Sequence, residues 1–183
     1  ENRAMLAELF QMEQYVTMAL SYARLGNPTK DLVLTRVPLD PVIRQAIRDF
    51  APLLIRKKLR LQYEPTAESA LTDSKWLLFI LHQLLSNAVK YTPDGGHIRV
   101  TAGTVGERVW MEVADDGIGI PKADRSRIFE RFYRVDKARS RESGGTGLGL
   151  SIATEIVQRH NGTLSLVDRE GPGTTVRLEL PIR

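Results

Sequence analysis

Residues with the chemistry of a nucleotide site gather first in Val113-Ala-Asp-Asp-Gly-Ile-Gly-Ile-Pro121. Here a carboxylate pair, Asp115 and Asp116, ends an apolar strand and is followed by Gly117 and Gly119. The glycines allow positive φ and a close approach of the backbone to a ligand. Alone, the pattern also fits an ordinary turn, because Asp and Gly are common turn residues.

Three companion segments favour a nucleotide site over a turn. Asn87-Ala-Val-Lys-Tyr91 ends an apolar helix upstream, while Gly144-Gly-Thr-Gly-Leu-Gly-Leu150 and Gly171-Pro-Gly-Thr-Thr175 follow downstream. The four segments in this order indicate one nucleotide site.

Each segment offers a distinct contact. The Asn87 side-chain oxygen is a hard ligand that suits Mg²⁺, and Lys90 adds a point charge for phosphate. A carboxylate at Asp115 accepts a hydrogen bond from the amino group of adenine and repels the oxygen of guanine, so it would favour ATP over GTP. Thr174 could add a hydroxyl near the same base. The alternative for Asn87 and Lys90 is an ordinary solvated helix end.

The glycine-rich segment 145–149 opens a helix, where backbone N–H groups can hold a phosphate. It lacks the Gly-Lys-Ser/Thr ending of a P-loop, the G-x-G-x-x-G spacing and the motifs of ordinary protein kinases. Basic side chains before it could close over the phosphates or simply be solvated; they are Arg134, Lys137, Arg139 and Arg141.

The three histidines are interpreted mainly as structural. His160 lies at a helix C-terminus, where a cation is favoured, and His97 opens a strand without a partner in the sequence. His82 adjoins Gln83 one turn before Asn87, so contact with the γ-phosphate region is the less favoured alternative to a structural role.

The elements that position these residues are read from hydrophobic periodicity. We expect helices over residues 1–25, 41–60, 75–91 and 147–160 and a short helical piece from 121, with residues 56–60 as the basic end of the second helix. Strands are expected over 31–39, 61–64, 98–104, 108–114, 163–168 and 174–180. Asp40 is the expected N-cap of the second helix, and Asp73 or Ser74 that of the third. Residues 134–145, basic and poor in apolar side chains, are expected to be mobile.

The first helix has a heptad seam, formed by Met5, Leu9, Met12, Val16, Ala19 and Ala23. The seam predicts one strand of a helical bundle that dimerises, or else a helix packed on its own domain. The remainder predicts an α+β fold, a two-layer sandwich of one mixed sheet with helices on one face, preceded by this long helix.

Composition narrows the function further. The chain has 183 residues, 42% hydrophobic, a net charge of +4 and no cysteine, which excludes disulfides and thiolate metal sites. Scattered basic residues without interleaved aromatic residues argue against nucleic acid as a partner. No apolar run approaches the roughly 20 residues that span a bilayer, and Glu1 in place of Met suggests a piece of a longer protein.

Together the segments resemble the catalytic ATP-binding domain of sensor histidine kinases, in the superfamily of gyrase, Hsp90 and MutL. The resemblance covers residues 30–183, with 87–91 as the N box, 115–119 as G1, 129–132 as the F box, 145–149 as G2 and 171–174 as G3. It implies the Bergerat-type ATP-binding fold, with Mg-ATP under a mobile lid.

The resemblance implies roles for particular residues. Asn87 would hold the metal, and Gln83, Asn87 and Lys90 would form the catalytic set. The nucleotide contacts would be Asn87, Lys90, Tyr91, Asp115, Gly117, Gly119, Ile120, Phe132, Gly145, Thr146, Gly147, Leu148, Gly149 and Thr174.

The resemblance also implies an organisation and partners. Residues 1–26 would be the second helix of a dimerisation and phosphoacceptor domain, and 30–183 the catalytic domain. The partners would be that dimerisation domain, in a homodimer, and a response regulator receiver domain. We expect a cytoplasmic part of a membrane-anchored bacterial protein, anchored only through upstream segments. Two runs, around residues 12–20 and 50–58, are similar to the intramembrane-sensing kinases of cell-envelope stress.

Two departures shape the predicted chemistry. Gln83 stands where an asparagine is usual in the N box, and an amide cannot act as the general base that the ATP hydrolases of the superfamily supply as glutamate. No histidine lies in a phosphoacceptor motif, so the acceptor is expected on a missing upstream helix. The alternatives are an ATPase or conformational clamp, and a dimerisation module whose boxes are only turns.

Overall fold

The computed structural model describes residues 32–131, 133, 135 and 149–183, and seven separate residues before them. Those seven are Met5, Leu9, Met12, Glu13, Val16, Leu20 and Ala23, all helical and exposed. Five of the six seam positions are therefore helical with side chains open to solvent, and Ala19 lies outside the described residues. No described helix combines the length and apolar character needed to cross a membrane.

A five-stranded mixed sheet forms one layer of the fold, in the order β2-β4-β5-β7-β6. The strands are β2 (Arg60–Tyr63), β4 (His97–Val105), β5 (Arg108–Asp115), β6 (Thr163–Leu166) and β7 (Thr174–Pro181). β2 pairs with β4 in parallel and the other pairs are antiparallel. Strict alternation of buried and half-buried residues along β5 shows that one face of the sheet meets the core.

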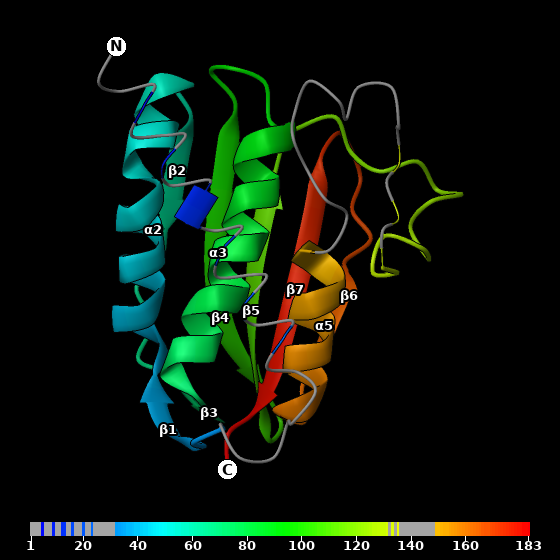
Figure 1. Cartoon of the computed structure of the whole chain (residues 1–183). Helices are drawn as coiled ribbons and strands as arrows, with labels where there is room; N and C mark the ends of the chain where they lie inside the picture. The colour runs from blue at the N-terminus through cyan, green and yellow to red at the C-terminus, as the bar shows by residue number, and fades with distance from the viewer. Residues whose placement is uncertain are drawn as a thin grey trace.

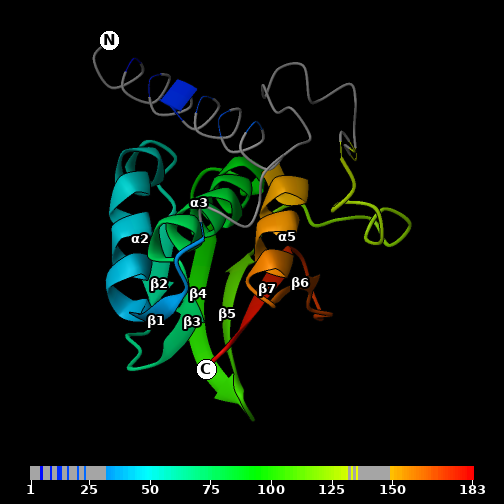
Figure 2. The same cartoon turned by 60° about the horizontal axis from the view of Figure 1, so that its bottom comes forward.

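Helices cover that face: α2 (Leu39–Arg56), α3 (Ser74–Tyr91) and α5 (Gly149–Arg159) (Figures 1 and 2). α3 lies between the other two and is the most deeply buried, with Leu77, Ile80 and Leu81 at or below 1% exposure. The architecture is the expected α+β sandwich, with the core between the helix layer and the sheet.

A second, two-stranded sheet corrects one prediction. β1 (Thr35–Pro38) was expected at the edge of the main sheet, but it pairs antiparallel with β3 (Ser69–Thr72), a strand that the sequence reading missed. The polar residues at both ends of β3 break its hydrophobic pattern, so only pairing with β1 defines it.

Of the two predicted N-caps, that of α2 differs in the structure and that of α3 is confirmed. α2 begins at Leu39 with Pro38 at the N-cap and no side-chain cap, so Asp40 is not the cap and lies in the first turn. There it accepts hydrogen bonds from Arg44 and from the Tyr63 hydroxyl, which is why it does not fold back on the backbone. For α3 the cap is Asp73, whose Oδ1 accepts from the backbone N–H groups of Lys75 and Trp76.

The segment after Pro121 is not helical. Successive hydrogen bonds from Asp124, Arg127 and Glu130 to residues three earlier form a run of turns instead. The start of the last helix before Gly149, and the segment expected to be mobile, lie largely outside the described residues.

Candidate functional site

Four elements begin or end toward one end of the sandwich: β5 ends and β7 begins beside it in the sheet, while α3 ends and α5 begins in the helix layer (Figure 1). Antiparallel register sets Asp115, the last residue of β5, opposite Thr174, the first of β7. All four predicted motifs have described residues at this end: three are described in full, and the glycine-rich segment 144–150 only at Gly149 and Leu150.

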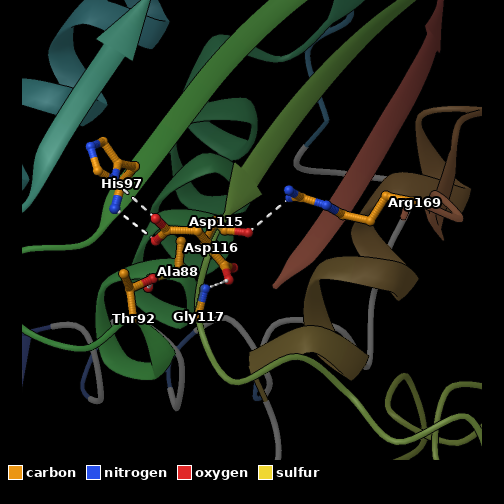
Figure 3. A network of polar contacts seen from close by, with 7 residues as sticks. All are labelled: Ala88, Thr92, His97, Asp115, Asp116, Gly117 and Arg169. Atoms are coloured by element: carbon orange, nitrogen blue, oxygen red, sulfur yellow. Dashed lines mark hydrogen bonds and ion pairs between the residues drawn. The ribbon is translucent and has the colours of Figure 1, made fainter. Parts of the chain in front are cut away.

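The two adjacent aspartates point to opposite sides (Figure 3). Asp115 faces the helix layer and is 8% exposed. Its Oδ1 accepts from the backbone N–H groups of Gly117 at 2.9 Å and Thr174 at 3.3 Å, which leaves Oδ2 for a further donor. Asp116 turns outward, and its two oxygens accept from the backbone N–H of His97 at 2.7 Å and from His97 Nδ1 at 2.9 Å.

Their electrostatics differ accordingly. Burial raises the pKa of Asp115, against the opposing effect of the two backbone N–H groups and of Arg169. Hydrogen bonding from His97 lowers the pKa of Asp116. The pair therefore divides into a buried carboxylate facing the helix layer and an outer carboxylate that ties the turn to β4.

The end of α3 contacts this turn directly. The Ile118 N–H donates to the Tyr91 carbonyl at 3.2 Å, and a Cβ on Gly117 would lie 2.3 Å from that same oxygen. Gly117 is thus required for close approach and does not have the positive φ expected for it, whereas Gly119 does, at 72°. Lys90, one residue before Tyr91, holds its ammonium 5.4 Å from the Tyr91 ring centroid.

A second glycine allows a close approach between two helices. A Cβ on Gly149, the first residue of α5, would lie 2.5 Å from Gln83 Oε1. Gln83 is buried within α3, one turn before the half-buried Asn87. The structure therefore brings the N-box helix against the start of the helix that follows the glycine-rich segment.

The remaining predicted site residues fall into two groups. Ile120 is half-buried, and its carbonyl accepts from Arg125 Nε at 3.2 Å. Phe132 and the run Gly145, Thr146, Gly147 and Leu148 lie outside the described residues, as do the basic residues Arg134, Lys137, Arg139 and Arg141.

Each of the three histidines has a protein partner. His97 bonds to Asp116, as described above, and the partners of His82 and His160 lie away from the end of α3. His82 Nε2 lies 2.8 Å from Asp49 Oδ2 on α2, so it does not face the nucleotide end as the less favoured reading allowed. His160 is fully buried and its Nδ1 lies 2.6 Å from Thr72 Oγ1. Burial lowers the pKa of His160, so it is a neutral structural residue and not the helix-end cation expected.

Three contributors to this site were not recognised in the sequence. Arg169 donates to the Asp115 carbonyl at 2.9 Å, Lys57 caps the end of α3, and Gly173 approaches so closely that its Cβ would lie 1.9 Å from the Asp115 oxygen. The glycine was present in the predicted Gly-Pro-Gly-Thr segment. Arg169 and Lys57 carried no local signal, since a basic residue in a loop or helix end is ordinarily solvated.

Comparison with known proteins defines the class. Residues 72–183 match the family described as histidine kinase-, DNA gyrase B- and HSP90-like ATPase. The chain belongs to this family, and the matched range contains both the end of α3 and the Asp115 turn.

The individual relatives that the chain resembles are sensor histidine kinases. Sensor histidine kinase WalK of Bacillus subtilis is 49% identical over 113 residues, which are 61% of this chain and 18% of WalK. Sensor-like histidine kinase SenX3 of Mycolicibacterium smegmatis is 34% identical over 178 residues, 97% of this chain and 46% of SenX3. The chain thus spans less than half the length of these two relatives.

A solved structure shows the same arrangement of elements. Full-length ShkA in complex with AMPPNP superposes with a TM-score of 0.76 at 30% identity, covering 95% of this chain and 36% of ShkA. The fold is therefore that of histidine kinase catalytic domains.

Proposed function

We propose that this chain is the ATP-binding catalytic portion of a two-component sensor histidine kinase, which passes the γ-phosphate of ATP to a histidine and from there to a response regulator aspartate. One observation carries the proposal. The buried Asp115 carboxylate is held by two backbone N–H groups and keeps an oxygen for a donor at the end of α3. ShkA, of the same fold, binds AMPPNP.

Asp115 would select the base. Its Oδ2 accepts from the adenine amino group, and the Tyr91 and Thr174 side chains flank the same end of the sandwich. Guanine presents an oxygen in place of that amino group, and a buried carboxylate facing an acceptor loses its hydrogen bond and gains repulsion. The site therefore favours ATP.

Asn87 and Lys90 would hold the triphosphate end. Within the described residues no group of three or more His, Cys, Asp or Glu side chains could bind a metal. We propose that Asn87 supplies one protein oxygen to Mg²⁺ and that phosphate oxygens and water supply the others. This ligand set suits Mg²⁺, which keeps several waters in nucleotide sites. When bound, the ion would neutralise charge that develops on the transferred phosphoryl group.

Gln83 favours phosphoryl transfer over hydrolysis. Its amide is packed between α3 and the start of α5, and an amide cannot remove a proton from water. The acceptor histidine is proposed on an upstream helix, since His82, His97 and His160 bond to Asp49, Asp116 and Thr72.

The domain organisation that we propose is that of sensor histidine kinases. Residues 1–26 would be the second helix of the dimerisation domain and 30–183 the catalytic domain, in a homodimer that meets a receiver domain and reaches the membrane through upstream segments. The exposed helical residues of the heptad seam support a helical partner. WalK and SenX3 give no support to the intramembrane-sensing subclass, and the proposal does not extend to it.

Calorimetric titration of Mg-ATP tests the assignment. We expect micromolar-to-millimolar affinity, on the order found for small nucleotide sites, and its loss in Asn87→Ala and Asp115→Ala. Asp49→Asn is the matched control, because this carboxylate lies on α2 and faces His82, away from the end of α3, so its variant should bind like wild type. Unchanged affinity in both alanine variants would overturn the proposal, and substantial ATP turnover by the chain alone would favour an ATPase instead.

A further inference from the structure

Arg169 spans from the loop before β7 to the last residue of β5. Its Nη1 donates to the Asp115 carbonyl at 2.9 Å (Figure 3). The same nitrogen donates to Thr175 Oγ1 at 3.4 Å. A Cβ on Gly173 in the same loop would lie 1.9 Å from that carbonyl. The loop is therefore folded directly onto the peptide group from which the Asp115 side chain projects.

His97 holds the other side of the same turn. It donates to both oxygens of Asp116, whose backbone N–H in turn donates to the His97 carbonyl at 3.2 Å. With this side fixed to β4, Arg169 is the side chain that fixes the β7 side (Figure 3). Loss of Arg169 would leave the β7 side of Asp115 held only by the strand pairing and by the Thr174 N–H, at 3.3 Å from Oδ1.

We propose that Arg169 is a positioning residue for the nucleotide: by binding the Asp115 carbonyl and placing its positive charge beside that residue, it sets the carboxylate that meets the adenine. This inference rests on the proposed function and adds a residue that neither the motifs nor the family match assigns. Arg169 does not touch the nucleotide in this account and acts through Asp115.

The charges that act on Asp115 give the proposal a specific signature. Arg169 lowers the pKa of the Asp115 carboxyl, while burial and Asp116 raise it. Lys90, from α3, lies over the Tyr91 ring. The ionised carboxylate accepts from the two backbone N–H groups through Oδ1 and from adenine through Oδ2. Protonation removes the charge that strengthens both interactions, so affinity falls as pH drops through this pKa. Removing the Arg169 charge moves that fall to higher pH.

The experiment measures ATP affinity by calorimetry from mildly acidic to mildly alkaline pH for wild type, Arg169→Gln, Arg169→Lys and Arg108→Gln. Arg108 is the matched control, because its guanidinium also donates to a backbone carbonyl, that of Asn161 at 3.0 Å, away from the site. We expect Arg169→Gln to bind about fivefold to tenfold more weakly at neutral pH and to lose affinity at higher pH than wild type. Arg169→Lys should recover most of both.

The outcomes separate the two proposals. Wild-type protein that fails to bind ATP at any pH overturns the proposed function. Wild-type binding with an Arg169→Gln profile that matches Arg108→Gln overturns the positioning role alone. Thermal unfolding of each variant without nucleotide is measured in parallel, and a loss of affinity that follows a loss of stability in Arg169→Lys as well as Arg169→Gln also counts against the role.

Discussion

The ammonium group of Lys57 donates a hydrogen bond to the Thr92 carbonyl at 2.6 Å, and so joins the end of α2 to the end of α3. The same nitrogen donates to the Val89 carbonyl at 2.5 Å. The last carbonyls of a helix have no partner within it, and a cation is favoured at this end of the helix dipole. Lys57 therefore caps the turn that carries Lys90 and Tyr91.

Lys57→Met should destabilise the fold. The substitution keeps the aliphatic stem but leaves two carbonyls without their donor, which costs about 1–3 kcal/mol. Urea unfolding measures the change. Lys58→Met is the control, since Lys58 is exposed and the variant keeps a side chain at its φ of 53°. Equal stability of the two variants would show that the cap contributes nothing.

Gly117→Ala should affect both stability and nucleotide affinity. Its Cβ would lie 2.3 Å from the Tyr91 carbonyl oxygen, and the backbone on both sides must shift, at about 1–3 kcal/mol. Gly106→Ala is the control, because Gly106 has φ 59° with nothing within 4 Å. It should lose roughly 1–2 kcal/mol through backbone strain alone and keep its ATP affinity. Full ATP affinity in Gly117→Ala would contradict the contact between the two motifs.

Asp115→Asn should stabilise the nucleotide-free protein. Burial raises the pKa of Asp115, so the ionised form present at neutral pH is unfavourable in the folded state. Asparagine keeps an oxygen for the Gly117 and Thr174 N–H groups without the charge. We expect the Tm to rise by roughly 2–4 °C, measured by scanning calorimetry, while ATP no longer raises it further. A lower Tm would show that the charge is well accommodated.

Acid should weaken the fold through His160. Burial lowers its pKa, so the folded state keeps it neutral while the unfolded chain takes up a proton below about pH 6.5. Stability present at neutral pH is therefore lost as pH falls below that value, with the slope of one proton. Within the described residues, His160 Nε2 has no hydrogen-bond partner that would stabilise the protonated imidazole in the folded state.

His160→Gln should remove that slope, because glutamine can still accept from Thr72 and does not titrate. Guanidinium unfolding between about pH 7 and pH 5 measures the difference from wild type. His97→Gln serves as the comparison, since His97 is exposed and bonded to the outer Asp116. Identical pH dependence of wild type and His160→Gln would contradict a buried neutral histidine.

Much of the fold follows from local pattern. The buried face of α3 and the alternation in β5 each extend over many residues, and the turn at Gly106 lies between the two strands expected over 98–104 and 108–114. β3 and the start of α2 were missed because their conformations depend on contacts with residues distant in sequence. Asp40, for example, binds Tyr63 in preference to capping its own helix.

In the candidate site, too, local pattern predicted some features and contacts between distant residues decided the others. Glycine and aspartate spacing predicted where the β5 end and the α3 end would meet, because these residue types are required by the backbone itself. Asp115 was assigned the inward role and lies on the buried side of β5. The spacing does not show the pairing of β5 with β7, which sets Thr174 opposite Asp115. Arg169 and Lys57 escaped detection because their partners are carbonyl groups, which every residue carries.

The structure of the chain crystallised with Mg²⁺ and a non-hydrolysable ATP analogue tests the central claim most directly. The account predicts the adenine amino group within hydrogen-bond distance of Asp115 Oδ2, about 2.7–3.2 Å, and the Asn87 oxygen about 2.0–2.1 Å from the metal ion. An adenine ring bound away from Asp115, with the metal ion distant from Asn87, would contradict it.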